Sequence, residues 1–429
     1  MNFSEILFFY LPLVIGIYFY FKDIKKFCIV YLVDYAKGIT FLGIPSLTAN
    51  DIFHFMILLY LFDFFFVKKI KLQFDKGGKL LTLFFLFFVV HAVVGQNHDM
   101  PRSFFNKFFL FWDFLFFLAV IVTEKDAITL TRYSIYSYFI KIVMGLFILF
   151  FNNLFTGDFY SFQVFEYKDG FRYGALNSAY VLFIFSIVFL KGWQHKIGIL
   201  TSIVLIFISG SRTSLILIIV VVYAYLFLVG GKKRVKTSLH YVLPVTAIIF
   251  LFTVYIQKYS DDLPIYFGRY VYFLSNPIEA GGGRQAAYLI AVDKIKENVL
   301  LGNPVQNRRN IRQFSRNKNQ NAEIHALSGY MQNAYLANFY VYGLSGFLLM
   351  LSILYYYLKF SRRLYLYAPF KYKEYFLFIY LMVISAIFSC FSGGSYFSIL
   401  IPPVYLSIVT YFVHFFKYKN KRKSVVFEG

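Results

Sequence analysis

The sequence predicts an all-α fold: a polytopic membrane bundle of about 12 to 13 spanning helices, with one long extracytoplasmic loop that bears an amphipathic helix. The first reason is composition, because 59% of the residues are hydrophobic and 15% are charged, against about 25% in ordinary soluble domains. The second is that nearly uncharged runs of about 16 to 25 residues recur, each long enough for a hydrocarbon core of about 30 Å. The third is that basic clusters fall in alternate connections between these runs.

Each span is placed between its polar flanks. The predicted spans cover residues 4–21, 51–67, 79–95, 104–122, 133–151, 174–190, 197–210, 212–230, 241–256, 331–357, 374–390 and 397–416. A further span at 27–45 is left open because it would carry Asp34 and Lys37. No small-residue cleavage site follows the first apolar run, so we expect that run to be retained as a span.

The basic clusters predict the orientation of the chain. They lie at 68–71, 232–234, 362–363 and 421–423. Since short cytoplasmic loops collect Lys and Arg, all four are expected in the cytoplasm, which fixes the orientation from residue 51 onward. Upstream, two arrangements stay open. If Lys22–Lys26 is cytoplasmic, 27–45 spans and the N-terminus lies outside; otherwise 27–45 lies on the outer surface.

Charge and cysteine content exclude several classes of function. The formal net charge of +22 would suggest nucleic acid in a soluble protein, but here Lys and Arg flank hydrophobic runs and act as topology signals. No nucleic-acid partner is therefore expected. Cys28 and Cys390 lack the spacing of a metal site or a disulfide framework. The sequence predicts neither a metal nor a cofactor.

One connection is much longer than the others. Residues 257–330 form a polar stretch that alternation places outside the cytoplasm, within a single membrane domain of residues 1–429. Ten basic and six acidic residues lie in this loop, and because long loops escape the positive-inside rule, the positive excess needs another explanation. Residues 284–298 are predicted to form an amphipathic helix at the membrane interface, with a hinge at Gly281–Gly283 before it. Its apolar face comprises Ala287, Ile290, Ala291 and Ile295.

Three arginines are expected on the outer side. Arg212 breaks two apolar runs within Ser209–Ser214, Arg284 begins the amphipathic helix, and Arg172 precedes the span at 174. Guanidinium groups bind phosphate and pyrophosphate oxygens at two points, so converging arginines suggest a lipid-linked phosphate substrate. The alternative is that these arginines extend to lipid headgroups, the usual fate of a charge at the end of a span.

A fourth segment opens the span after the loop. It runs from Met331 through Gln332, Asn333 and Tyr335 and continues to the small residues of 342–346. Polar residues at the mouth of a span, followed by small ones for close packing, are also compatible with a purely architectural role.

Taken together, these segments resemble the O-antigen ligase and O-antigen polymerase family. The matching features are Ser-Gly-Ser-Arg at 209–212, Arg284 with Gly302 downstream, and Gln332-Asn333 followed by nine residues, Gly343, two residues and Gly346. Residues 172–179 are a partial match to the family's Arg, Gly, Asn, Ala segment. The resemblance covers the order and spacing of segments over residues 170–350. Elsewhere the chain is similar only as a many-span membrane protein.

The resemblance implies metal-independent glycosyl transfer on the periplasmic face of the bacterial inner membrane, from glycans carried on undecaprenyl pyrophosphate. Arg212 and Arg284 would then hold the pyrophosphate leaving group as catalytic residues. Arg172, Asn333 and Tyr335 would bind the substrate.

Gln332 departs from the family pattern. Ligases of the family carry His at this position, thought to help activate the acceptor hydroxyl, whereas Gln cannot take a proton near neutral pH. Either another base serves, with His325 and Glu323 the nearest candidates, or leaving-group stabilisation suffices. Gln332 and His325 are therefore counted among the candidate catalytic residues, and the missing His favours a polymerase over a ligase.

The expected function is that of an O-antigen or capsular polysaccharide polymerase, which transfers the growing glycan with inversion onto an incoming lipid-linked repeat unit. One alternative is a ligase that passes the finished glycan to lipid A core or a protein. Another is a polysaccharide flippase or transporter, although that class is expected to line a cavity with charges from many spans. Expected partners are the undecaprenyl-pyrophosphate-linked glycan and the lipid bilayer, with a flippase and a chain-length regulator as further candidates.

Two charges are predicted deep in the membrane. Asp113 lies in the middle of the span at 104–122 and Lys141 in the middle of the span at 133–151. Charges at that depth are costly unless they are paired or functional. Because the two spans are consecutive and antiparallel, we expect a structural ion pair, with a transport role as the alternative.

Overall fold

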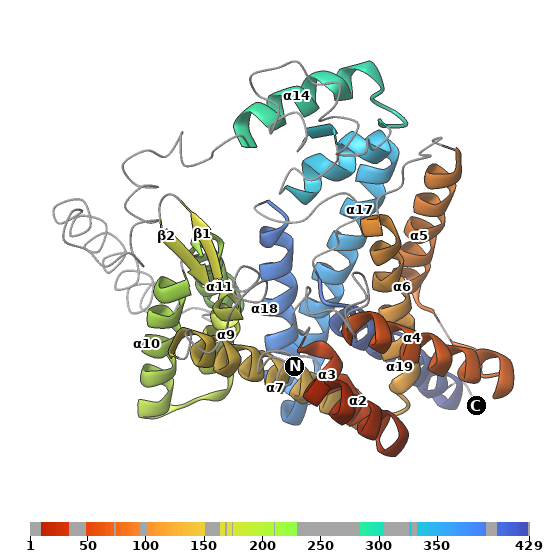
Figure 1. Cartoon of the computed structure of the whole chain (residues 1–429). Helices are drawn as coiled ribbons and strands as arrows, with labels where there is room; N and C mark the ends of the chain where they lie inside the picture. Colours follow the sequence, from red (N-terminus) through yellow and green to blue (C-terminus); the bar gives the residue numbers. More distant parts are fainter. Residues whose placement is uncertain are drawn as a thin grey trace. The chain divides into compact units, whose positions relative to one another are not determined.

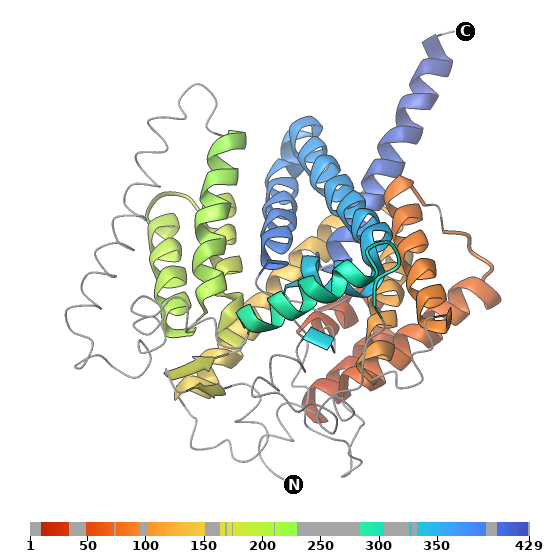
Figure 2. The ribbon, with the colours of Figure 1, turned by 90° about the horizontal axis from the view of Figure 1, so that it is seen from above.

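Helices dominate the structure, a computed structural model, and one antiparallel hairpin interrupts them (Figures 1 and 2). It describes residues 10–33, 49–72, 74–94, 102–150, 164–167, 170–173, 175–209, 211–229, 284–303, 326–327, 333–391 and 401–427. The chain folds as two compact units, each drawn from separate stretches of sequence. Unit 1 comprises Met1–Val67 and Lys125–Ala280, and unit 2 comprises Lys68–Glu124 and Gly281–Gly429.

Unit 1 is built mainly of helices that pack against their sequence neighbours. Its elements are α2 (Leu11–Lys22), α3 (Ile24–Leu32), α4 (Ala49–Phe62), the π-helical turn η3 (Asp63–Val67), α7 (Glu124–Phe150, from Lys125 on), β1 (Val164–Tyr167), β2 (Gly170–Tyr173), the 3-10 helix η5 (Ala175–Ser178), α9 (Ala179–Phe189), α10 (Gly192–Ser209) and α11 (Arg212–Val229). α2 contacts α3 and α4, and α9, α10 and α11 pack together. Gly198 allows α9 and α10 to approach closely, since a Cβ there would lie 2.3 Å from Ser186 Oγ.

Unit 2 is organised around its longest helix. Its elements are α5 (Lys76–Val94), α6 (Arg102–Val120), α14 (Arg284–Glu297), α17 (Ala334–Tyr367), η10 (Phe370–Tyr372), α18 (Lys373–Ser389) and α19 (Pro403–Phe427). α17 contacts α5, α14, α18 and α19, and α6 contacts α5 and α19. The Ser407 hydroxyl ties α19 to α6 by donating to the Phe114 carbonyl at 2.8 Å.

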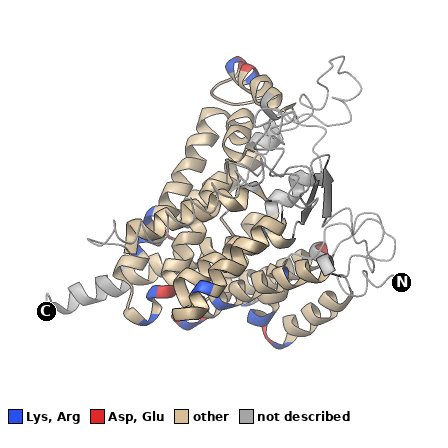
Figure 3. Ribbon diagram, turned by 90° about the vertical axis from the view of Figure 1, so that its left-hand side faces the viewer, with Lys and Arg blue, Asp and Glu red and all other residues tan. Residues whose placement is uncertain are grey.

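The apolar surface of the described helices is compatible with a membrane environment. Three helical segments within the described residues are long and apolar enough to cross a bilayer, namely Gly192–Ser209, Ala334–Tyr367 and Phe370–Ser389. Large apolar side chains are exposed as well as buried: Phe21 is 82% exposed and Phe66 is 68% exposed. Figure 3 shows long uncharged stretches of helix, with Lys, Arg, Asp and Glu gathered near helix ends. This distribution suits helices whose middle sections face lipid.

Most predicted spans coincide with helices, and the predicted helix at 284–298 is confirmed as α14. Three differences stand out. α17 continues to Tyr367, ten residues beyond the predicted end of its span, and it is kinked at Gly343. The predicted span at 174–190 contains η5 and then α9, which has 11 residues. The predicted span at 241–256 lies outside the described residues, as do 257–283, 304–325 and 328–330 of the long loop.

The β1–β2 hairpin departs from the all-α prediction. Its register pairs Val164 with Tyr173 and Phe165 with Arg172. The two strands are rich in aromatic residues, and the sequence that joins them contains Asp-Gly, a common turn signal. The hairpin could therefore have been predicted from sequence.

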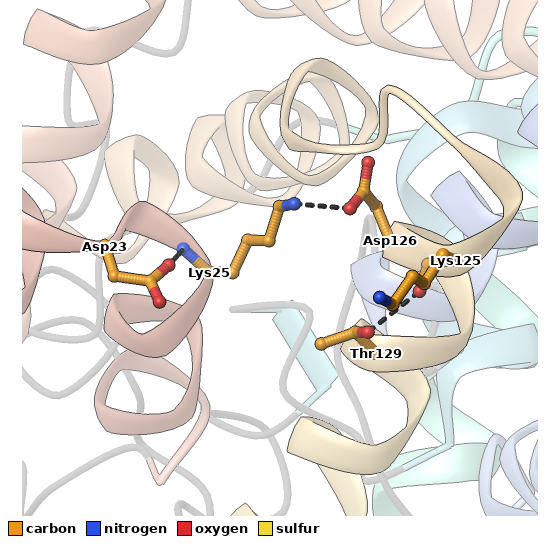
Figure 4. A network of polar contacts seen from close by, with 5 residues as sticks. All are labelled: Asp23, Lys25, Lys125, Asp126 and Thr129. Carbon is orange, nitrogen blue, oxygen red and sulfur yellow. Dashed lines mark hydrogen bonds and ion pairs between the residues drawn. The ribbon is translucent and has the colours of Figure 1, made fainter.

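An ion pair connects distant parts of unit 1. Asp23 caps α3, accepting a hydrogen bond from the Lys25 backbone N–H at 3.1 Å, and the Lys25 ammonium pairs with the carboxylate of Asp126 near the start of α7 (Figure 4). The two residues are 101 positions apart. Residues 22–26 and the first turn of α7 therefore lie at the same end of this unit.

Candidate active site

Five of the seven predicted site residues lie in the described part of the chain. Arg172 and Arg212 belong to unit 1, whereas Arg284, Asn333 and Tyr335 belong to unit 2. The other two, His325 and Gln332, lie outside the described residues. The side chains of the three arginines also lie outside the description, so these residues are located by their backbones.

Arg212 is the first residue of α11, and a serine turn fixes it there. The Ser211 hydroxyl accepts a hydrogen bond from the Ser214 N–H at 3.4 Å, as an N-cap side chain does. The Ser214 hydroxyl donates to Ser211 Oγ at 2.9 Å, and the Ser211 N–H donates to Ser209 Oγ at 3.2 Å. All three serines are buried, and they satisfy one another in a turn that reverses the chain between α10 and α11.

Arg172 lies at the same end of unit 1 as Arg212. α9 and α10 are consecutive helices in close contact, so the start of α9 lies near the end of α10. β2 and η5 directly precede α9, and both contact α10. The fold therefore brings Arg172 of β2 toward the serine turn, although 39 residues separate it from Arg212 in the sequence.

Asn333 and Tyr335 both fix the start of α17. The Asn333 side chain caps the helix, accepting from the Leu336 N–H at 3.0 Å. The Tyr335 hydroxyl donates to the Ile387 carbonyl near the end of α18 at 3.0 Å, and its ring lies 4.5 Å from that of Phe391. A further bond runs from the Ala334 N–H to the Cys390 carbonyl at 2.8 Å. These contacts give both residues a structural role beside the predicted one in substrate binding.

Arg284 is the first residue of α14, which lies across the N-terminal end of α17 (Figures 1 and 2). The predicted apolar face is confirmed at its most buried positions: Ala287 and Ala291 are fully buried and Ile295 is 7% exposed. The charged residues lie outside, where Lys296 pairs with Asp293 at 2.8 Å and Lys294 with Glu297 at 2.7 Å. Leu289 and Val292 are also exposed, at 63% and 42%. The free surface of α14 thus carries both charged and apolar side chains, and the predicted location of this helix at the membrane interface stays a prediction.

Gly302 and Gly343, from two of the family-like segments, meet in unit 2. Both have positive φ, +79° and +62°, which L side chains rarely adopt. A Cβ on Gly302 would lie 2.3 Å from the Val341 carbonyl oxygen, and one on Gly343 would lie 2.3 Å from that of Leu300. Two stretches of backbone cross here at a separation that only glycine permits. We call residues 299–303 and 340–345 together the glycine joint.

Sequence reasoning missed Asn303, which follows Gly302 in the joint. It is 9% exposed, and its side-chain amide donates to the Lys294 carbonyl in the last turn of α14 at 3.1 Å and to the Tyr340 carbonyl of α17 at 3.4 Å. No local motif marks this Asn, because its partners lie 9 and 37 residues away. The adjacent Gly302 was the only sequence signal nearby.

In the part of the chain that the structure describes, no cluster of three or more His, Cys, Asp or Glu side chains could hold a metal ion.

Comparison with known proteins adds no assignment: no family model matches the chain, and no curated protein or solved structure is significantly similar to it. The resemblance to the O-antigen ligase and polymerase family therefore rests on the order and spacing of its short segments in the sequence.

Proposed function

We propose that this protein is a polysaccharide polymerase of the bacterial inner membrane. It transfers a growing glycan from undecaprenyl pyrophosphate onto the terminal sugar of an incoming lipid-linked repeat unit, on the periplasmic face. The observation that carries the proposal is the contact between Gly302 and Gly343. These glycines come from two separate family-like segments, and their contact ties the helix that starts at Arg284 to the helix that follows Gln332-Asn333.

The proposed topology draws support from the Lys25–Asp126 ion pair. Asp126 lies in the connection between the predicted spans at 104–122 and 133–151, which alternation assigns to the cytoplasm. Since Lys25 pairs with Asp126, Lys22–Lys26 belongs on the same side. This favours the arrangement in which 27–45 crosses the membrane, which gives thirteen spans and an N-terminus outside.

The kink in α17 supports a site at the outer boundary of the membrane. Residues 344–367 on the cytoplasmic side of Gly343 would form a helix about 36 Å long, which suffices for a hydrocarbon core of about 30 Å. The segment 334–342 before the kink is then free to lie at the outer interface. α14 packs on α17 next to this segment, so Arg284 and Asn333 both belong to the interfacial layer in which a pyrophosphate headgroup would lie.

The proposed chemistry is an inverting displacement at the anomeric carbon. The acceptor hydroxyl oxygen bonds to that carbon and gives up its proton, while the carbon–oxygen bond to the pyrophosphate breaks and the bonding electrons pass to the leaving lipid pyrophosphate. Arg212 and Arg284 stabilise the negative charge that develops there, and fixed cations in a poorly hydrated site act strongly on such charge. His325 and Glu323 remain the candidate bases for the acceptor proton.

Substitution of Arg284 by Lys in cells tests the proposal. A guanidinium engages two phosphate oxygens, whereas an ammonium is a point charge, so Arg284→Lys should bind the anionic lipid but lose transition-state geometry. The rate should fall by about 10²-fold or more. Single lipid-linked repeat units should accumulate outside the cytoplasm and long chains should be absent, with Arg212→Lys giving the same pattern. Arg363→Lys, near the end of α17 on the predicted cytoplasmic side, is the matched control.

The same cells separate the rival functions. A ligase defect would leave full-length chains attached to undecaprenyl pyrophosphate, because polymerisation would continue. A flippase defect would leave single repeat units facing the cytoplasm. Wild-type chain lengths made at wild-type rates in both arginine variants, at normal protein abundance, would remove the residues on which the proposed mechanism depends.

A further inference from the structure

At the glycine joint, one backbone hydrogen bond of α17 is broken, and the loop that follows α14 supplies the missing partners. In an uninterrupted helix the Leu344 N–H would donate to the carbonyl four residues earlier, that of Tyr340. Here the Leu344 N–H donates to the Val299 carbonyl at 2.8 Å, and the Tyr340 carbonyl accepts from the Asn303 N–H at 2.7 Å. Each group freed by the kink at Gly343 therefore finds a partner in the loop that follows α14.

This exchange makes the kink and the loop depend on each other. Backbone polar groups near lipid must be satisfied within the protein, so a kink without the loop would leave Tyr340 O and Leu344 N exposed. The Ser345 hydroxyl adds a bond to the Leu300 carbonyl at 3.1 Å. Leu300 and Leu301 within the joint are each 66% exposed, and such exposed apolar side chains suit the edge of a bilayer.

The Asn303 side chain extends the joint to α14 itself. Its amide bridges Lys294 O at the end of α14 and Tyr340 O in α17, so it ties the last turn of α14 to α17 in addition to the packing of the buried face of α14. α14 has 14 residues and is therefore about 20 Å long, with Arg284 at its far end. A rotation of about 10° at the joint would move Arg284 by about 3.5 Å on a helix of that length. Displacements of about 1 Å can cost about 10²-fold in rate.

We propose that Asn303 is a positioning residue, which acts through the glycine joint to hold α14 in one direction and so to place Arg284 beside the start of α17. This inference rests on the proposed function, because Asn303 would affect the reaction by way of Arg284, the residue proposed to hold the pyrophosphate. It adds a defined joint between α17 and the described part of the loop after α14, and it identifies a residue that lies outside the family-like pattern.

The test compares two substitutions at Asn303, one that keeps the size of the side chain and one that removes most of it. Asn303→Asp keeps the shape but replaces the donating amide with a carboxylate that faces two carbonyl oxygens. We expect a loss of elongation rate of about tenfold or more at normal abundance, by analogy with the cost of misplacing a reacting group. Asn303→Ala removes the donors without adding repulsion and should lose less. A packing role alone would give the reverse order, because Asp fills the space of Asn and Ala does not.

A double-mutant cycle shows whether Asn303 acts through Arg284. If it does, Asn303→Asp should reduce the residual rate of Arg284→Lys by less than about twofold, because coupled residues are not additive. Equal losses from Asn303→Asp in the two backgrounds would overturn the inference, and so would a wild-type rate for Asn303→Asp alone. If Arg284→Lys itself behaves like wild type, the proposed function fails and the positioning role fails with it.

Disulfide cross-linking tests the glycine joint without any measurement of activity. Val299→Cys with Leu344→Cys should form a disulfide in membranes, since the backbones of these residues are hydrogen-bonded and both side chains are partly exposed. Cys28 and Cys390 are buried and should not compete. Gly302→Ala should abolish cross-linking. Gly192→Ala is the control, since Gly192 has a φ of +59° with nothing within 4 Å of an added Cβ, and it should cross-link like wild type. Undiminished cross-linking in Gly302→Ala would contradict the joint.

Discussion

Substitution of Asp75 should reveal how unit 2 is held together next to α17. Asp75 is 9% exposed and caps α5, accepting from the Gly78 N–H at 2.8 Å, while its other oxygen accepts from the Tyr356 hydroxyl of α17. Gly77 allows this approach, since a Cβ there would lie 2.5 Å from the Tyr356 ring. The Asp75 carboxyl group thus caps the start of α5 and holds α17 beside it.

The expected loss follows from these two bonds. Removing an N-cap costs about 1 kcal/mol, and leaving a buried hydroxyl without its partner costs about 2 kcal/mol. Asp75→Ala should therefore lower the free energy of unfolding by about 3 kcal/mol, equivalent to roughly 6–12 °C in the midpoint for a unit of about 200 residues. Asp75→Asn keeps an acceptor for Gly78 and offers Tyr356 a donor, so it should lose much less.

The pH dependence of stability distinguishes the effect of an ionisable carboxyl group at position 75 from the effect of the side chain's shape. Burial raises the pKa of Asp75 above its ordinary value, while the hydrogen bonds from Tyr356, Gly78 and Gly77 and the charge of His414 oppose the shift. The folded state then binds the proton more tightly than the unfolded state. Stability from this group is therefore present in full below the unfolded pKa of about 3.9 and is lost as pH rises through the folded pKa. Asp75→Asn should lack that loss.

Buried thiols provide the assay. Cys390 is buried in unit 2, so a thiol-reactive dye in a Cys28→Ser background reports unfolding of that unit. The midpoint of the Asp75 protein should rise relative to that of Asp75→Asn as the pH falls from neutral toward the unfolded pKa of about 3.9. Parallel midpoints across this range, or a loss in Asp75→Ala no larger than the roughly 1 kcal/mol expected from the cap alone, would refute the reasoning.

Three further predictions concern topology and buried charge. A topology reporter fused near Asn310 should be active only in the periplasm, and activity in the cytoplasm would overturn the site. A cysteine in place of Lys26, which is exposed, should resist an impermeant maleimide in intact cells and react in inverted vesicles; labelling in intact cells would contradict the thirteen-span arrangement. Neutralising Asp113 or Lys141 should lower protein abundance and exchanging their charges should restore much of it. Normal abundance with lost activity in Asp113→Asn would make that residue functional.

Helix positions could largely be predicted from sequence because apolar length and basic flanks reflect the bilayer. The buried face of α14 could be predicted for a similar reason, since Ala287, Ala291 and Ile295 repeat at helical spacing. The kink in α17 could not, because Gly343 alone is also compatible with close helix packing. Its conformation depends on a loop 40 residues earlier in the chain.

Long-range polar partners were also beyond the reach of sequence. Lys25 and Asp126 each look like ordinary charges at the end of a span, and Asp75 looks like a cap alone. In the candidate site, too, the sequence predicts some features and only the fold reveals others. The sequence predicts that Arg172, Arg212 and Arg284 lie on one side of the membrane, and the fold adds the elements that carry their backbones: a hairpin, the helix after a serine turn, and α14. The Asp113–Lys141 pair and the single membrane domain stay predictions.

Reconstitution of the purified protein tests the central claim most directly. Liposomes would contain the protein and a synthetic repeat unit linked to undecaprenyl pyrophosphate, without nucleotide sugar and with a chelator present. The account predicts ladders of elongated lipid-linked glycan, release of one undecaprenyl pyrophosphate per added unit, and loss of both products with Arg284→Lys but not with Arg363→Lys. Movement of the repeat unit across the bilayer without elongation, or elongation that is unchanged in Arg284→Lys, would contradict it.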